Sequence, residues 1–462
     1  MDSRPNVVWV TLDSVRQDRT TMGGHDRDTT PHLQRIGTTG RSFDSCIAAG
    51  IWTLPSSASI LTGTYPSHNT VGIDGETIPA ELSTVAERFS AAGYRTACLS
   101  RNGHLSAATG MDRGFDRFEW LAASTLLSAA GPRTLAKYLL NVRRHSAGFT
   151  TETAKHATPF LMNDIGKRWL DDLVAAEPFF CYLHYNEPHR PFVPPIPWQE
   201  QYTDGIEATA AEAIDIAMDV HRNMYDRVAS GNPLTGRERE ALLAMYDAEV
   251  AYTDECIGRL YDHVRALPTD RETLFIVTAD HGEMLGDRGL LAHNLALDDA
   301  LVNVPLVATG LESLGADDGD IIQHTDLMRT LLGMADADVD GVQGVDLRAE
   351  EREFAISQRG PANFDLYLEH DGSFGASRFH ESTVTALRTE THRYQRSDDR
   401  AALFALPDET TEVSGAEPEV VAELDRALEQ WLRSQGSPVG KGRSAEFDDA
   451  MRRQLSDLGY VE

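Results

Sequence analysis

Short apolar runs that alternate with helix-like segments constrain the fold of this chain most strongly. The run 6–12 is almost continuously apolar and is followed by the carboxylate of Asp13. Later runs at 94–99, 178–185, 273–278 and 304–308 are strand-like in the same way. Near-continuous apolar strands are typical of parallel sheets that are buried on both faces. The alternation therefore predicts an α/β fold, with helices covering both faces of a large central sheet.

The character of the chain changes near residue 350. Short extended segments follow, at 384–388 and 393–396. An amphipathic helix is expected at about 417–434, because apolar side chains recur on one of its faces at Val420, Leu424, Leu428, Trp431 and Leu432. We therefore expect a catalytic α/β domain at 1–348 and a smaller C-terminal α+β subdomain at 349–462, with a small antiparallel sheet and a helix.

The charge of the chain excludes two classes of partner. Its 72 acidic and 42 basic residues give a net charge of −30. Such a surface repels nucleic acid and anionic membranes, so neither is expected to bind. The acidity is spread along the whole chain, as is typical of a halophilic protein, in which salt screens the self-repulsion.

The apolar runs and the cysteines predict the cellular compartment of the protein. No apolar run approaches the length of a membrane span, and residues 1–5 lack a basic, apolar leader. The four cysteines, Cys46, Cys98, Cys181 and Cys256, form no C-x-x-C pair. We expect a cytoplasmic protein in a reducing compartment, without disulfides.

The stretch 50–63, GIWTLPSSASILTG, carries a candidate nucleophile. Pro55 is placed where a helix would start, 56–62 is helix-like, and Gly63 can end the helix. This puts the hydroxyl of Thr53 just before a helix N-terminus, where free backbone N–H groups favour an anion such as phosphate or sulfate. The alternative is a Ser/Thr-rich helix cap without chemistry.

Polar side chains at the ends of the predicted strands suggest a metal centre. Ligands of open α/β sheets gather at the carboxyl ends of the strands. Asp13, Thr53 and the pair Asp280-His281 occupy such positions. Two carboxylates, an imidazole and a hydroxyl suit one divalent metal ion. Such an ion would polarise the Thr53 hydroxyl and offset charge on an anionic group under attack.

Several segments together resemble a known family. They are NVVWVTLDSVRQD, TLPSSASILTGTYPSHNTVG, FFCYLHYNEPHRPF and LFIVTADHGEMLGDRGLLAHNLALDDALVNVPLVATG. The chain resembles a sulfatase-like hydrolase of the alkaline phosphatase superfamily over nearly its whole length. The resemblance implies an alkaline-phosphatase-like fold with a mixed, mostly parallel central sheet. It also implies Asp13, Asp280 and His281 as metal ligands, and Thr53 as both ligand and nucleophile.

The same resemblance assigns further histidines. It implies that His189 contacts the anionic group, and that His293 contacts the ester oxygen or protonates the leaving group. His184 is a weaker candidate, since it could equally be a hydrogen-bonded core histidine. Asn102 and His104 are minor candidates for the anion pocket. Glu283 is expected to be a helix-start or surface carboxylate.

The departures from the sulfatase pattern shift the expected substrate. Sulfatases carry a cysteine or serine that is oxidised to formylglycine, where this chain has Thr53. The usual arginine is Ser57, the second aspartate is Ser14, and the expected lysine is Ala292. A threonine nucleophile resembles instead the superfamily's phosphodiesterases and phosphoalcohol transferases. His281 replaces the sulfatase asparagine, which favours manganese or zinc over calcium or magnesium.

The sequence thus predicts a metal-dependent hydrolase that cleaves an anionic ester, with a phosphodiester or phosphonate monoester favoured and Thr53 as nucleophile. The substrate would be a small molecule or the ester of a glycan or lipid headgroup. Three alternatives stay open: a sulfuric ester hydrolase without formylglycine, a phosphoalcohol transferase, and a non-catalytic anion-binding relic. The leaving group and the oligomeric state are not specified by the sequence.

Overall fold

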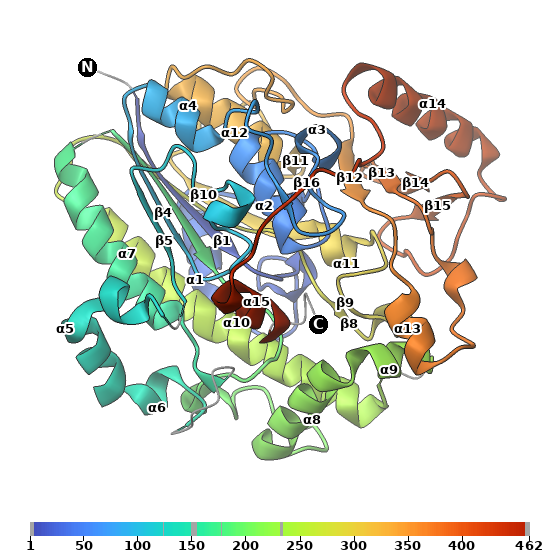
Figure 1. Ribbon diagram of the computed structural model, residues 1–462, viewed down its shortest axis with the longest axis horizontal. Coiled ribbons are helices and arrows are strands. Elements are labelled where there is room, and N and C mark those ends of the chain that lie inside the picture. Colours follow the sequence, from blue (N-terminus) through green and yellow to red (C-terminus); the bar gives the residue numbers. More distant parts are fainter. Residues whose placement is uncertain (1–3, 123, 149–154, 177, 232–233, 458–462) are drawn as a thin grey trace.

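A mixed eight-stranded sheet forms the centre of the molecule (Figure 1). The computed structural model describes residues 4–122, 124–148, 155–176, 178–231 and 234–457. The strand order is β11-β2-β10-β7-β1-β6-β4-β5, and only β10 runs antiparallel to its neighbours. The strands are β1 (Asn6–Leu12), β2 (Arg41–Ile47), β4 (Arg95–Ser100), β5 (Arg117–Trp120), β6 (Phe179–Tyr185), β7 (Thr273–Ala279), β10 (Asn303–Thr309) and β11 (Ile321–Gln323). The predicted mixed, mostly parallel sheet is confirmed.

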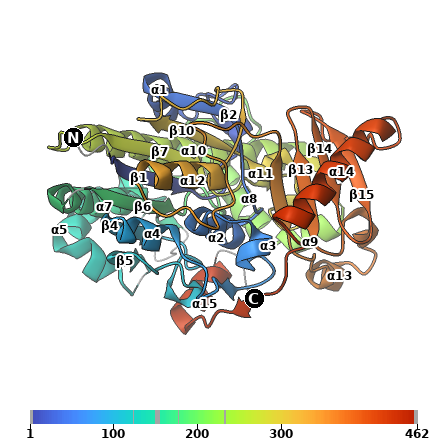
Figure 2. The same ribbon diagram turned by 90° about the horizontal axis from the view of Figure 1, so that it is seen from above.

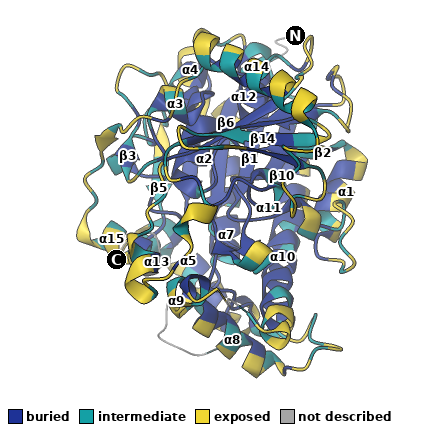
Figure 3. Cartoon of the chain, turned by 90° about the vertical axis from the view of Figure 1, so that its right-hand side faces the viewer, coloured by how far each residue is buried: buried dark blue, intermediate teal, exposed yellow. Residues whose placement is uncertain are grey.

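Helices cover both faces of this sheet, as the alternating pattern predicted. One layer consists of α1 (Pro31–Thr39), α7 (Pro159–Leu173) and α10 (Gly236–Arg265), which contact one another and the sheet. The other consists of α2 (Thr53–Thr62), α4 (Val85–Ala91) and α12 (His324–Met334). Outside the first layer, α5 (Leu126–Leu140) packs on α7, and α8 (Ala210–Arg222) packs on α10. The short helix α6 (Val142–His145) contacts α5, and α9 (Met224–Ala229) contacts α8. The sheet itself is buried, whereas the outer helices turn exposed residues to the surface (Figure 3).

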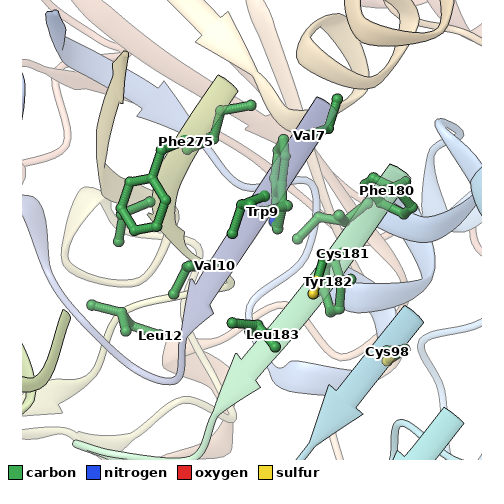
Figure 4. Packing of buried hydrophobic residues seen from close by; sticks show 14 of the residues in the cluster. Val7, Trp9, Val10, Leu12, Cys98, Phe180, Cys181, Tyr182, Leu183 and Phe275 are labelled. Carbon is green, nitrogen blue, oxygen red and sulfur yellow. The ribbon is translucent and has the colours of Figure 1, made fainter. Parts of the chain in front are cut away.

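The register of the central strands determines where polar groups emerge. Trp9 of β1 lies opposite Tyr182 of β6 and Ile276 of β7, and apolar side chains project from these paired strands into the core (Figure 4). At the end of β1, Leu12 is paired with Tyr185 on one side and with Ala279 on the other. The three strands therefore end level with one another, and the residues that follow them meet at one edge of the sheet.

A second, antiparallel sheet lies beside the first (Figure 2). Its strands are β12 (Ala355–Arg359), β13 (Val384–Arg388), β14 (His392–Arg396) and β15 (Ala401–Ala405), and α14 (Pro418–Ser434) packs against β14. One hydrophobic cluster joins Ile47 and Leu301 of the main sheet region to Tyr367 and Val384 of this part. Because the two parts share a core, the boundary at 348/349 stays a prediction.

The end of the chain returns to the main sheet region. β16 (Arg443–Ser444) is paired with β3 (Glu76–Thr77), and α15 (Asp449–Asp457) follows. The Gln454 side chain accepts a hydrogen bond from Trp120 Nε1 (2.8 Å) and donates one to the Arg101 carbonyl (2.6 Å). Figure 1 shows α15 lying in front of the sheet, near the ends of the central strands.

The helix α4 begins at Val85, because Thr84 and Glu87 form a capping box there. One expected helix start differs from the structure. The helix expected at 56–62 begins at Thr53 and ends at Gly63, whose φ is 66°. The four cysteines are buried and free. Among the described residues, none of the helices combines the length and apolar character needed to cross a membrane.

The acid stability of the fold should depend on His324. This side chain is buried at the start of α12, its Nε2 lies 2.9 Å from the Thr278 hydroxyl, and burial lowers its pKa to about 3. The unfolded chain, with an ordinary histidine pKa of about 6.5, binds more protons below that pH. The contribution of neutral His324 to the free energy of unfolding is therefore complete above pH 6.5, and it is lost as the pH falls towards 3.

Replacing His324 with glutamine should remove this proton linkage. We expect the unfolding free energy from urea denaturation to change less steeply between pH 6 and pH 4, by about 1 kcal/mol per pH unit. Replacement of the exposed His68 by glutamine serves as the control and should leave the slope unchanged. An unaltered slope in the His324 variant would contradict the assignment.

Candidate metal centre and active site

Two carboxylates meet where the central strands end. The Asp13 N–H donates to the Tyr185 carbonyl (3.1 Å), and the Asp280 N–H donates to the Leu12 carbonyl (3.2 Å). These bonds continue the strand pairing by one residue, so Asp13 and Asp280 leave the sheet at the same level. Both side chains are completely buried. Asp280 Oδ1 accepts hydrogen bonds from the N–H groups of Ser14 (3.3 Å) and His281 (2.8 Å).

The Thr53 hydroxyl lies next to these groups. Its Oγ1 donates to Asp13 Oδ2 (3.4 Å) and lies 3.3 Å from His281 Nε2. The position differs slightly from the expectation, since Thr53 is the first residue of α2 and Trp52 is its N-cap. The first N–H groups of a helix have no partner within it, so positive potential still faces this hydroxyl. Residues separated by more than 200 positions in the chain thus converge as the sequence predicted.

The His281 ring is held in one orientation. Its Nδ1–H donates to the Gly282 carbonyl (2.8 Å), which can only accept a hydrogen bond. Its Nε2 faces Asp13 Oδ1 at 3.4 Å and Asp280 Oδ2 at 3.8 Å. A backbone carbonyl that fixes the ring in this way is typical of metal-binding histidines.

His184 belongs to the same cluster, although the sequence favoured it less. Its Nε2 lies 3.8 Å from Asp13 Oδ2 and 3.9 Å from Asp280 Oδ2. One ligand atom from each of Asp13, His184 and Asp280 fits within 4.8 Å of the others. The signal was present in the sequence, because His184 is the next-to-last residue of the strand-like run. Only the pairing of β6 with β1, in which His184 lies opposite Thr11, places it there.

The electrostatics of the cluster favour a bound cation. Burial opposes ionisation of Asp13, but His189, His184 and His281 together hold the pKa of that carboxyl well below its usual range. Burial and the neighbouring Asp13 raise the pKa of Asp280 well above its ordinary value. Within the described residues, Asp280 Oδ2 accepts no hydrogen bond. Two buried carboxylates at one place are costly unless a positive charge joins them.

The donor set fits a divalent metal ion. Ligand bonds of ~2.1 Å place neighbouring tetrahedral ligands roughly 3.4 Å apart. The distances of 3.3–3.9 Å between the donor atoms of Asp13, Thr53, His184, Asp280 and His281 are close to this value. Mixed oxygen and imidazole donors suit manganese or zinc. The four side chains predicted as ligands thus lie together, and His184 lies with them.

Two further side chains hold the carboxylate and the hydroxyl in place. Asn102 Nδ2 donates to Asp13 Oδ2 (3.0 Å) and contacts Thr53 Oγ1 (3.5 Å). Ser14, which replaces the second aspartate of the sulfatase pattern, donates from Oγ to Asp13 Oδ1 (2.9 Å). Asn102 was expected only as a minor candidate for the anion pocket. Its contacts instead make it a positioning residue for both Asp13 and Thr53.

The two histidines that the resemblance assigns to the anionic ester, His189 and His293, lie beside the cluster. The His293 ring centroid is 4.5 Å from that of His281 and 5.4 Å from that of His189. Burial lowers the pKa of His189 to about 4 and that of His293 well below its ordinary value. Both imidazoles are therefore neutral at pH 7. The expectation for Glu283 was wrong, since it is buried, with Oε1 at 3.4 Å from His293 Nδ1.

A cavity of about 740 Å³ opens beside these groups. Trp52, His104 and His293 line it, together with parts of the C-terminal subdomain and α15. His104 is buried, its ring centroid lies 5.4 Å from that of Trp52, and burial lowers its pKa to about 3. A volume of this size accommodates a small-molecule ester.

Comparisons with known proteins agree on one family. The model of the family described as Sulfatase matches residues 5–337. The uncharacterized sulfatase YidJ of Escherichia coli is 25% identical over 80% of this chain and 75% of its own length. An arylsulfatase of Clostridium perfringens is 24% identical over 82% and 83%. The phosphonate monoester hydrolase of Agrobacterium radiobacter has a similar structure, with a TM-score of 0.73, 21% identity, and coverage of 94% and 96%.

Proposed function

Because this chain belongs to the sulfatase family, within the alkaline phosphatase superfamily, we propose that it is a metal-dependent hydrolase with Thr53 as its nucleophile. The favoured substrate is a phosphodiester or phosphonate monoester of a small molecule, glycan or lipid headgroup. Asp13, Thr53, Asp280 and His281 would hold one divalent ion, manganese or zinc, with His184 as a fifth ligand.

One observation carries this proposal. The buried Thr53 hydroxyl is at the N-terminus of α2 and lies within 3.4 Å of both Asp13 Oδ2 and His281 Nε2. A hydroxyl in a packed interior would be bonded to a backbone carbonyl, as the Thr62 hydroxyl is to that of Ala58 (2.7 Å). Thr53 is instead surrounded by groups that can accept its proton or share a cation with it.

The geometry suggests a two-step displacement. A bound dication would supply Lewis acidity, which lowers the pKa of the Thr53 hydroxyl and offsets charge on the ester. Thr53 Oγ1 gives up its proton and attacks phosphorus, forming the Oγ1–P bond while the bond from phosphorus to the leaving oxygen breaks. The neutral imidazole of His293 or His189, whose pKa is raised by the anionic substrate, takes up that proton and passes it to the departing oxygen. Water then gives a proton to the same imidazole and attacks phosphorus, and the proton returns to Thr53 Oγ1 as the Oγ1–P bond breaks.

The choice of phosphorus over sulfur depends on three side chains. Oxidation of Thr53 would give a ketone, because its extra methyl group prevents formation of the formylglycine aldehyde. Ser57 and Ala292 replace the arginine and lysine expected of a sulfatase, and both residues are buried. An unmodified alcohol nucleophile suits transfer of a phosphoryl group.

A panel of matched esters tests the proposal. Purified protein in high salt with added manganese or zinc is assayed on aryl esters that share one leaving group. These are a phosphodiester, a phosphonate monoester and a sulfate. We expect kcat/KM for a phosphorus ester to exceed that for the sulfate by about 10²-fold or more. Faster turnover of the sulfate would favour the sulfatase alternative, and no turnover with any dication would favour the binding relic.

A further inference from the structure

A second cavity adjoins the first, on the small antiparallel sheet. It has a volume of about 190 Å³ and lies between β12–β15 and the segment 288–298. Its charged and titratable lining consists of Arg288, Asp298, Arg359, Arg378, His380 and Arg400. Arg359 and Leu295 line both cavities. A wall with this many guanidinium groups is unexpected in a chain with a net charge of −30.

Arg359 is the central residue of this pocket. Its side chain is buried, with 5% exposure, and it donates to the carbonyls of Gly360 (2.8 Å) and His380 (2.7 Å). Among the described residues, no carboxylate lies within 4.0 Å of its guanidinium. Burial lowers its pKa to about 10, while the more distant Asp399 favours the charged form, so Arg359 remains charged at pH 7. A buried cation with no carboxylate in contact is stabilised when an anionic ligand binds it.

The single acidic group of the lining is already neutralised. Asp298 forms ion pairs with Arg288 and with Arg393, the latter at 3.0 Å. Arg400 lies 3.6 Å from Glu412, which is a loose pair. The net charge of the pocket is therefore positive.

Two other residues of the wall are consistent with that charge. The Arg378 guanidinium stacks 4.9 Å from the ring centroid of Phe379 and has no carboxylate within 4.0 Å in the described part of the chain. Burial, together with Arg400 and Arg359, lowers the pKa of His380 to about 4. His380 is therefore neutral at pH 7, and the guanidinium groups carry the charge of the pocket.

We propose that this pocket binds an oxyanion group, a sulfate, phosphate or carboxylate, through the guanidinium of Arg359 with Arg378 beside it. Arginine binds such groups through two parallel N–H donors. Because the pocket shares Arg359 with the cavity that contains His293, one molecule can place its reacting ester at the metal centre and a second anionic group here. The assignment to a substrate group rests on the proposed function, whereas anion binding by the pocket does not.

Selenate, a heavier analogue of sulfate, tests binding without any turnover. Crystals of the full chain are soaked in selenate, and its position is read from anomalous scattering. We expect a peak within hydrogen-bond distance of Arg359 in the wild type, its loss in Arg359→Gln, and a weaker peak in Arg378→Gln. The control is Arg396→Gln on β14, whose guanidinium is paired with Asp425 (2.7 Å) and Glu429 (2.8 Å), and it should keep the peak.

A wild-type crystal without selenate in this pocket, or an Arg359→Gln crystal that retains it, would overturn the proposal. If Arg359→Gln does not fold, the exposed Arg378 variant still decides, since a peak of unchanged height in Arg378→Gln would reject the proposed pair of arginines. These results do not depend on hydrolysis, so a failure of the proposed function would be recognised separately.

Kinetics distinguish a substrate group from a free anion. Two aryl phosphodiesters are compared, one of which carries a carboxylate on the arm that does not leave. Arg359→Gln should raise KM for the carboxylated ester by about tenfold or more relative to its effect on KM for the ester without the carboxylate. Equal effects on both esters would reject the substrate group and leave a free anion as the occupant.

Discussion

Replacing Thr53 with alanine is expected to lower kcat for a phosphodiester by at least about 10³-fold, because the attacking oxygen is removed. The loss should appear in kcat and kcat/KM together, since the other groups that bind the substrate remain. Thr53→Ser keeps the oxygen and should retain activity within about 10²-fold. This pair of variants separates the role of the hydroxyl from that of the methyl group, which packs at the start of α2.

The covalent intermediate gives an independent measurement. When the wild type is quenched during turnover, its intact mass should increase by that of the transferred group, and peptide mapping should place the increase on Thr53. Neither the mass increase nor a modified peptide at position 53 is expected with Thr53→Ala. If that variant kept wild-type turnover, the nucleophile would be another group and the mechanism above would be wrong.

Removal of the metal ion should have an effect of similar size. Dialysis against a chelator is expected to lower kcat/KM by at least about 10³-fold, since the Thr53 hydroxyl is then no longer activated. Manganese or zinc should restore activity. Asp280→Asn removes the negative charge of a carboxylate whose Oδ2 accepts no hydrogen bond from the described residues. The variant should therefore weaken metal binding by about 10²-fold or more.

The raised pKa of Asp280 predicts that metal binding releases a proton, which can be measured separately. Burial and Asp13 raise this pKa well above its ordinary value, so the metal-free protein holds a proton that binding must displace. Calorimetric titration in buffers of different ionisation enthalpy should therefore detect proton release on metal binding. The control is Asp262→Asn, a partly exposed residue paired with Arg35 on the far end of α10. It should change neither affinity nor proton release. Full activity after complete metal removal would contradict the proposed centre.

Much of the fold was predictable because strands buried on both faces consist almost entirely of apolar residues. The runs that became β1, β6 and β7 are apolar on both faces, and their bounds differ from the expected ones by no more than about a residue. β2 was missed, because its sequence RSFDSCI mixes polar and apolar side chains, its first two positions are only half-buried and Asp44 is exposed. The antiparallel direction of β10 has no signature in its own residues, since strand direction depends on the path of the chain between strands.

The candidate site, too, was predictable from the sequence only in part. The sequence placed Asp13, Thr53, Asp280 and His281 at strand or helix ends, and the resemblance to a family joined them into one centre. Neither could rank His184 above an ordinary core histidine, or show that Asn102 donates to both Asp13 and Thr53, because these contacts depend on the relative level of neighbouring strands.

Local chemistry, namely which segments are buried strands, which residues begin helices and which side chains could bind a cation, was determined by the sequence itself. The tertiary structure alone decided which of these groups face one another and which are left without a countercharge. Arg359 illustrates this, since it is the last residue of β12 and has no local feature that distinguishes it from other arginines. Its burial without a described carboxylate in ion-pair contact arises only when the small sheet packs against the segment that ends at Asp298. The physical reason is that side-chain identity and periodicity act over a few residues, whereas burial and electrostatic balance depend on atoms brought together from distant parts of the chain.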